Sequence, residues 1–192
     1  AVLGIVTAVG SMISMALCPL LIKKLNERNA YILLSVYGFA ASVFSFVIGH
    51  FWFQSPKNMV LTVLFYASLF LIGLQVGAVP LMTMIMTADT VDYYEYETGK
   101  RMEGACYSIL TLTIKVCLAL GTAVGLIFVQ KSGYYESLTA GTFTTKTKDI
   151  IFFAYTALPG ILALISIFPM FKYDIVGEKK AKISTELAAR RK

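Results

Sequence analysis

Long apolar segments separated by short charged ones make up most of the chain. Each apolar segment reaches or approaches the roughly 20 residues that an α-helix needs to cross a bilayer. Lipid cannot satisfy the backbone groups of open strands, so these spans should be helices. The pattern predicts an all-α integral membrane protein with about five transmembrane helices. The expected spans are residues 1–22, 31–52, 58–88, 104–129 and 150–171, followed by a basic tail at 172–192.

Small and polar residues within the first and third spans indicate how the helices pack. One helical face of the first span, spaced i, i+4, i+7 and i+11, carries Thr7, Ser11, Ser14 and Cys18. This face suits close packing, which we favour, or a wet cavity. Gly73 and Gly77 allow close helix approach in the third span, where Pro80 should kink the helix. Gln75 is expected to face a neighbouring helix or a cavity.

Several shorter features qualify this pattern. Pro19 should bend the end of the first helix, and Asn26 in the basic loop after it is expected to take a left-handed backbone conformation. His50 beside Phe51 and Trp52 resembles part of an interfacial aromatic belt. A proton-relay role for His50 is the less favoured alternative, because no acidic residue lies near it in the sequence. Residues 130–149 are predicted to form an exposed loop. Pro159 should bend the fifth helix, and the tail should form a short surface helix from about Glu178.

Composition supports a membrane location and narrows the possible functions. Hydrophobic residues are 57% of the chain and charged residues only 15%, clustered between the apolar blocks. We interpret the net charge of +6 as membrane orientation, because the basic tail lacks the interleaved aromatics of a nucleic-acid site. About twelve basic residues lie on one side and about four on the other. The positive-inside rule therefore predicts a multi-pass protein of the cell membrane with a cytoplasmic C-terminus.

The sequence gives no sign of an enzyme or a metal site. Cys18, Cys106 and Cys117 are widely spaced within or beside apolar segments, which is typical of small core residues. No credible pairing of a nucleophile with a base is visible, and no cofactor is expected. The chain does not begin with Met and opens inside an apolar run, so we expect it to be part of a longer protein.

Lys115 is the most unusual residue in the apolar segments. It lies 11 residues beyond Gly104, or ~16 Å along a helix, near the middle of a bilayer core ~30 Å thick. A lysine at that depth costs about 2.5–3.5 kcal/mol, so it should face a cavity or an opposite charge. A lysine paired only for packing is the plainer alternative. Tyr107, Thr111 and Thr122 share its helical face and Ser108 flanks it, so this stripe could line a ligand cavity or form an interhelical hydrogen-bond seam.

Acidic residues crowd the end of the third span. Asp89, Asp92 and Glu95 recur every three residues, where carboxylates oppose the helix macrodipole and require compensation by Lys100, Arg101 or basic loops elsewhere. They form either a solvated helix end or a cytoplasmic gate of ion pairs that also includes Glu103. Asp89 is deep enough to meet Lys115, but we favour a carboxylate from outside this chain as the partner of that lysine.

These residues together resemble a known family. The run from Ala88 to Gly104, followed by Tyr107, Ser108 and Lys115, is similar to the glycoside–pentoside–hexuronide:cation symporter family of the major facilitator superfamily, to which melibiose permease belongs. The tail from Lys172 to Arg191 also resembles that family's ending. The resemblance implies a twelve-helix transporter in two halves, of which this chain would supply helices eight to twelve. The N-terminal half and helix seven would be absent.

The resemblance also implies roles for single residues. Lys115 matches a lysine near the family's cation site, Thr111 and Tyr107 would line the sugar side, and the coordinating carboxylates would lie in the absent half. The chain departs from the family where Asn26 or Glu27 replaces a usual glycine, and where Tyr94 replaces another.

The sequence thus predicts part of a secondary transporter. It would couple uptake of a sugar or glycoside to Na⁺ or H⁺ by alternating access, with Lys115, Thr111, Tyr107, Ser108 and Gln75 at the coupling site. The alternatives are a membrane sensor or regulator that does not transport, or an inactive truncated product. A channel is disfavoured because the spans supply no continuous polar pore.

Overall fold

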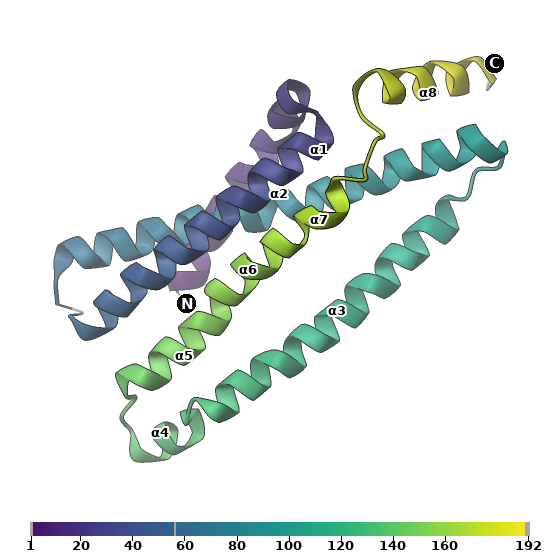
Figure 1. Cartoon of the computed structure of the whole chain (residues 1–192). Coiled ribbons are helices and arrows are strands. Elements are labelled where there is room, and N and C mark those ends of the chain that lie inside the picture. Colours follow the sequence, from purple (N-terminus) through teal and green to yellow (C-terminus); the bar gives the residue numbers. More distant parts are fainter. Residues whose placement is uncertain (1, 56, 191–192) are drawn as a thin grey trace.

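The fold is a bundle of long helices whose order follows the apolar segments (Figure 1). A computed structural model describes residues 2–55 and 57–190, with side chains from residue 4 onward. Ala1, Arg191 and Lys192, counted above in the first span or the tail, lie outside the described residues. No strand occurs in the described part, so the all-α prediction is confirmed. The helices are α1 (Val2–Gln54), α2 (Met59–Thr98), α3 (Glu103–Lys131), α4 (Tyr134–Ala140), α5 (Thr145–Tyr155), α6 (Ala157–Ile165), α7 (Ile167–Met170) and α8 (Gly177–Arg190).

Helix α1 consists of two helical arms that meet at a sharp kink at Asn26, where the chain reverses direction, so the arms are the first two predicted spans (Figure 1). Asn26 is the only non-glycine residue with positive φ in the described part of the chain, at φ 61° and ψ 161°. The positive φ was expected, but ψ lies far from the left-handed helical value of about +47°. This backbone region is occupied almost only by glycine, so Asn26 is strained.

The two arms of α1 pack closely on α2 through glycines. A Cβ atom on Gly10 would lie 2.6 Å from the Phe70 carbonyl oxygen. A Cβ atom on Gly73 or Gly77 would overlap the carbonyl oxygens of Thr7 and Ser11. The small and polar face of the first arm therefore serves helix packing, with Ser14 and Cys18 buried. The predicted role of the two α2 glycines is confirmed.

Helix α2 is longer than the predicted span, because it continues ten residues past position 88 to Thr98. Gly99 ends it in a left-handed conformation at φ 69°, and its N–H donates to the carbonyl of Glu95. Pro80 lies inside α2 and Pro19 inside α1, so neither proline ends its helix. The acidic residues therefore project from the last turns of a helix, not from a loop.

Prolines divide the last span into three short helices. Pro159 and Pro169 cannot donate to the carbonyls four residues earlier, at Tyr155 and Ile165, and their rings crowd those carbonyls. The breaks between α5, α6 and α7 fall directly after these two residues. The segment 130–149 is not a plain loop as predicted, because it contains α4. Gly133 and Gly141 flank α4 in left-handed conformations.

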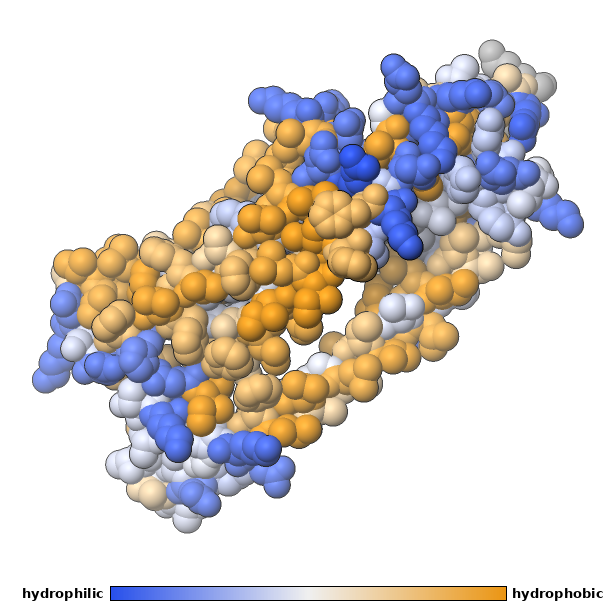
Figure 2. Space-filling view, viewed as in Figure 1, coloured by the Kyte–Doolittle hydropathy of each residue, from blue (hydrophilic) through white to orange (hydrophobic). Residues whose placement is uncertain are grey.

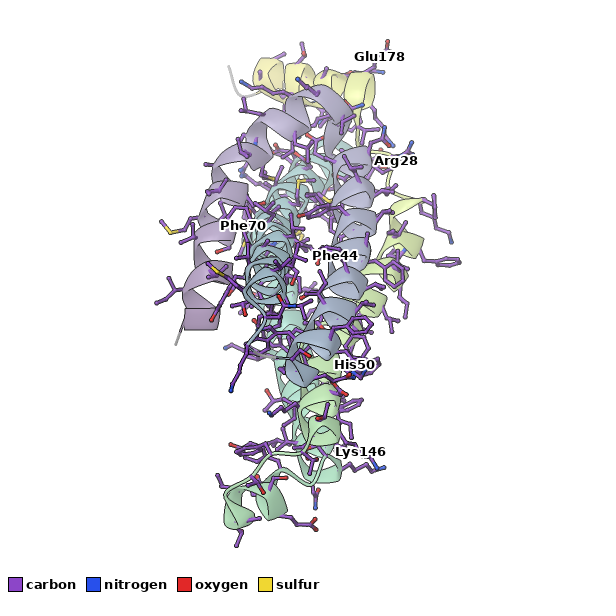
Figure 3. The ribbon with its side chains drawn as sticks, turned by 90° about the vertical axis from the view of Figure 1, so that its left-hand side faces the viewer. Arg28, Phe44, His50, Phe70, Lys146 and Glu178 are labelled. Carbon is purple, nitrogen blue, oxygen red and sulfur yellow. The ribbon has the colours of Figure 1, made fainter. Side chains whose placement is uncertain are left out.

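The surface has the distribution of apolar and polar residues that is expected of a membrane protein. Apolar residues form a broad band between two hydrophilic ends (Figure 2). Arg28 and Glu178 lie at one end, His50 and Lys146 at the other, and Phe44 and Phe70 between them (Figure 3). Four described segments, Gly4–Gln54, Met59–Thr98, Glu103–Lys131 and Thr145–Met170, are long and apolar enough to cross a bilayer. Since α1 contributes two arms, these segments amount to five spans.

We expect Gly77→Ala to destabilise the contact between α1 and α2. The new methyl group would meet the Ser11 backbone carbonyl, which cannot rotate away, and such overpacking costs about 1–3 kcal/mol. The apparent melting temperature of the purified protein should fall by several degrees. Gly125→Ala in α3 is the matched control, since a Cβ there meets nothing within 4 Å. Equal melting temperatures for the two variants would contradict the close packing.

We expect Asn26→Gly to stabilise the protein. Glycine removes the strain at positive φ, worth about 1–3 kcal/mol, and loses part of that gain through the greater freedom of the unfolded chain. The melting temperature should rise by a few degrees. Asn29→Gly, inside the helical second arm, should lower it instead, because glycine is a poor helix former. A fall in both variants would show that Asn26 is not strained.

Candidate functional site

Arg101 gathers the acidic residues at the end of α2. Its Nη1 lies 2.9 Å from a carboxylate oxygen of Glu95 and 3.4 Å from one of Asp92, while its Nε donates to Glu103 at 2.9 Å. The guanidinium thereby compensates carboxylates that oppose the macrodipole of α2. Lys100 forms no ion pair with the residues that the structure describes. Of the basic residues predicted to act here, Arg101 therefore makes the contacts.

Asp89 belongs to a second cluster, which joins three helices. The Lys180 ammonium of α8 lies 2.8 Å from the carboxylate of Asp89 and 2.6 Å from that of Glu27, which begins the second arm of α1. The two carboxylates are buried, with Glu27 6% and Asp89 9% exposed. One ammonium therefore neutralises two carboxylates that come from separate helices. Tyr173 adds a hydrogen bond to Asp89 at 3.4 Å.

Burial and charge act in opposite directions on Lys180. Burial alone would lower the pKa of its ammonium, but the hydrogen bonds that it donates to Asp89 and Glu27, together with their negative charges, outweigh burial and raise that pKa. Burial and then the negative charges of Asp89 and Glu27 raise the pKa of the Tyr173 phenol, which keeps its proton and donates a hydrogen bond to Asp89. The cluster therefore holds a charged lysine and a neutral tyrosine at neutral pH.

Apolar contacts fix α8 over this cluster. Ile183 and Leu187, 4% and 3% exposed, pack with Ile175 against the rings of Tyr93 and Tyr96 on α2. The Arg190 guanidinium donates to the Tyr96 carbonyl at 3.0 Å and lies 5.4 Å from the Tyr96 ring centre. The tail is thus a docked helix, beginning one residue before the predicted Glu178.

Sequence reasoning missed Glu27, Tyr173 and Lys180. A signal for Lys180 was present, because positions 180, 183 and 187 share one helical face that carries a lysine and two apolar residues. Glu27 is the single acid in a basic loop, which also singles it out. What the sequence did not contain was the folding of the tail back onto α1 and α2.

The predicted stripe on α3 is exposed and lies along one hollow. Gly104, Tyr107, Ser108, Thr111, Leu112 and Lys115 line an open hollow of about 520 Å³. No described residue of α3 is buried, and the Lys115 ammonium forms no ion pair or hydrogen bond within the described chain. Figure 2 shows an opening between α3 and the neighbouring helices. Asp89 does not meet Lys115, because Lys180 and Tyr173 occupy its carboxylate.

Gln75 lies apart from the α3 stripe. It is half-buried in α2, where its amide fills the space beside Gly38 of α1. It lines a smaller hollow of about 370 Å³ together with Tyr31, Ser35 and Ser166. Tyr31 donates to the Ser166 hydroxyl across this hollow at 3.1 Å. The structure therefore brings together four of the five predicted coupling residues and leaves Gln75 outside.

His50 has an acidic neighbour that the sequence did not reveal. Its Nδ1 lies 2.9 Å from the Asp149 carboxylate at the start of α5, and the Gln54 amide nitrogen lies 2.8 Å from its Nε2. Since an amide nitrogen only donates, Nε2 accepts and Nδ1 donates to Asp149. The residue is therefore more than an interfacial ring, because it ties the end of α1 to α5.

The sequence of this chain matches a known protein family. The family model described as MFS/sugar transport protein matches residues 1–177. The chain belongs to this family. The match takes in all five spans, the α3 stripe and the acidic end of α2, and it ends at the start of α8. No solved structure matches the chain.

The curated relatives of this chain are longer than the chain itself. It is 24% identical to a glucuronide carrier protein homolog of Escherichia coli, over 96% of this chain and 38% of the relative. It is 26% identical to a putative sulfoquinovose importer of the same organism, over 94% of this chain and 36% of the relative. It is 29% identical to a lactose permease of Lactobacillus delbrueckii, over 92% of this chain and 27% of the relative. The chain spans less than two fifths of the length of these relatives.

We expect Lys180→Met to release α8 from its contacts with α1 and α2. The substitution leaves the buried carboxylates of Glu27 and Asp89 close together without a cation, which is strongly unfavourable. Amide hydrogen exchange within residues 177–190 should speed up at least tenfold. Lys182→Met is the control, because Lys182 is exposed and its pair with Glu186 spans 4.0 Å. Equal exchange in the two variants would show that apolar contacts alone hold α8.

Proposed function

We propose that the complete protein is a secondary transporter that couples the uptake of a sugar or glycoside to Na⁺ or H⁺. The observation that carries this proposal is the hydroxylated stripe on α3, with a lysine ammonium that has no partner in the described chain. Hydroxyl groups and an ammonium are suitable donors and acceptors for a hydroxylated ligand. The family match and the carrier, importer and permease named among the relatives support the same class of function.

The exposure of the apolar side chains of α3 supports a second transporter half as a partner. Large apolar side chains of α3 are exposed, among them Ile109 at 66%, Leu112 at 64% and Leu118 at 69%. A charged lysine beside such residues at the level of the bilayer needs a cavity or a carboxylate. We infer that an N-terminal half closes over this face and supplies the counter-charge of Lys115. Paired halves with a site at the bilayer midplane are the usual design of secondary transporters.

The ion pairs near the C-terminal end of α2 suit a gate. Arg101 holds Glu95 of α2 by an exposed side-chain ion pair, which could break without unfolding either α2 or α3. The basic residues concentrate at this end, so the positive-inside rule assigns it, and the C-terminus, to the cytoplasm of a cell. Closing and opening of this end would then accompany alternating access of the site on α3.

Cation-dependent uptake by the complete protein tests the proposal. Lys115→Ala should reduce coupled sugar uptake at least tenfold, because the ammonium that balances the site is lost. Lys115→Arg keeps the charge but changes its shape and hydration, so uptake should be retained only in part. Lys131→Ala, in the exposed last turn of the same helix, is the matched control and should transport normally.

The comparison needs equal amounts of folded protein, which expression level and melting temperature establish. Unchanged uptake with both Lys115 variants would exclude a coupling role for this residue. Absence of sugar uptake by the unaltered complete protein, with a panel of glycosides and either cation, would favour a sensor or regulator instead.

A further inference from the structure

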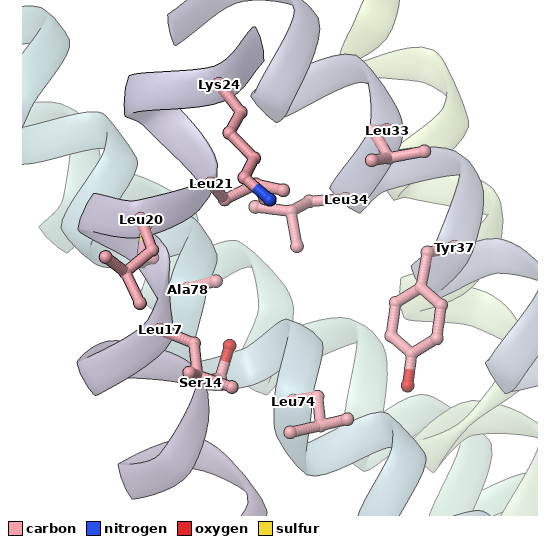
Figure 4. A pocket seen from close by; sticks show the side chains of 11 residues that line it. Ser14, Leu17, Leu20, Leu21, Lys24, Leu33, Leu34, Tyr37, Leu74 and Ala78 are labelled. Atoms are coloured by element: carbon pink, nitrogen blue, oxygen red, sulfur yellow. The ribbon is translucent and has the colours of Figure 1, made fainter. Parts of the chain in front are cut away.

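An apolar groove lies between the two arms of α1 and is floored by α2. Its volume is about 500 Å³, within the ~300–1,000 Å³ typical of sites for small molecules. Leucines from both arms form its walls, as the close view shows (Figure 4). Tyr37 contributes its ring, since its hydroxyl already donates to the Leu71 carbonyl at 2.9 Å. The walls include Leu17, Leu21, Leu33, Leu34 and Tyr37.

Lys24 is the single charged residue that lines this groove. Its side chain extends over the groove toward Leu34 in Figure 4. Unlike Lys180, it forms no ion pair with an acidic residue of the described chain. It lies at the basic end of the first arm, beside Lys23 and close to Arg28. The groove thus joins a cation at the edge of the apolar band to a trough that runs into that band.

This arrangement selects its occupant by chemistry. A sugar would find few hydrogen-bond partners along leucine walls and would lose its hydration there. A further apolar helix would cover Lys24 without offering it a counter-charge, which is costly within a membrane. An amphiphile with a negative head and a hydrocarbon chain satisfies both the ammonium and the walls. Basic pockets between membrane helices bind anionic lipid headgroups in this way.

We propose that the groove binds an anionic phospholipid, whose phosphate contacts Lys24 and whose acyl chain lies between the two arms of α1. Bound there, the lipid bridges the two arms beside the strained turn at Asn26, with its headgroup at Lys24 and an acyl chain between the leucine walls. The site is separate from the α3 stripe, so lipid binding does not depend on the identity of the transported molecule.

Native mass spectrometry of the complete protein in detergent tests the site. Phosphatidylglycerol is the probe, and phosphatidylcholine with the same acyl chains is the reference lipid. We expect tighter retention of phosphatidylglycerol and a loss of about fivefold in its affinity with Lys24→Gln. Lys23→Gln is the matched control, because Lys23 is a neighbouring exposed lysine that does not line the groove. The affinity of this control variant for phosphatidylglycerol should stay unchanged.

A second variant tests the acyl chain independently of charge. Leu17 is 53% exposed and lines the groove, so Leu17→Phe should fold normally while filling the trough. This variant should weaken the binding of both phosphatidylglycerol and phosphatidylcholine. Soluble glycerol phosphate should not compete with phosphatidylglycerol for the unaltered protein. Equal losses for Lys23→Gln and Lys24→Gln, equal binding of the two lipids, or competition by glycerol phosphate would each overturn the proposal. Failure of the complete protein to retain lipid would show that another segment covers the groove.

Discussion

The basic end of the molecule depends on one ion-pair cluster, in which the Lys180 ammonium contacts the carboxylates of both Glu27 and Asp89. Glu27 and Lys180 are 153 positions apart in the sequence, yet their charged atoms lie 2.6 Å apart. Without the lysine, two buried carboxylates would face each other beside the negative end of the α2 dipole. The lysine therefore makes the turn of α1, the extension of α2 and the docked tail one unit. The apolar contacts of Ile183 and Leu187 determine where that lysine lies.

Sequence predicted the parts of the fold that the bilayer dictates. Span lengths follow from the thickness of the hydrocarbon core, so the bounds of α3 fell within two residues of the expectation. Gly73 and Gly77 signalled the close contact of α2 with α1, because only residues without a Cβ atom tolerate it. Asn26 was identifiable as the turn, since few residues other than glycine accept positive φ. These signals are local or periodic, and a single sequence carries them in full.

The long-range polar pairs could not be predicted in the same way. Asp149 is 99 positions from His50, and nothing in either segment marks the other as its partner. Asp89 had several plausible cations within reach of a helix end, including Lys100 and Lys115. The choice among them depends on where the tail docks, which is decided by apolar packing that the charge pattern does not record. The surroundings of Lys115 could not be predicted for a different reason, because no described residue of α3 is buried against the rest of the described chain.

The lysines of this chain separate by the depth at which they lie and by what neutralises them. Lys180 lies at the end of the bundle and finds its carboxylates within the chain, so that contact can hold the fold together. Lys115 lies in the middle of an apolar helix and finds none there. A lysine neutralised by fixed partners cannot respond to a cation, whereas one whose counter-charge comes from across a moving interface can. The proposed coupling role of Lys115 would require an ammonium with no partner in the described chain, and this property separates Lys115 from Lys180.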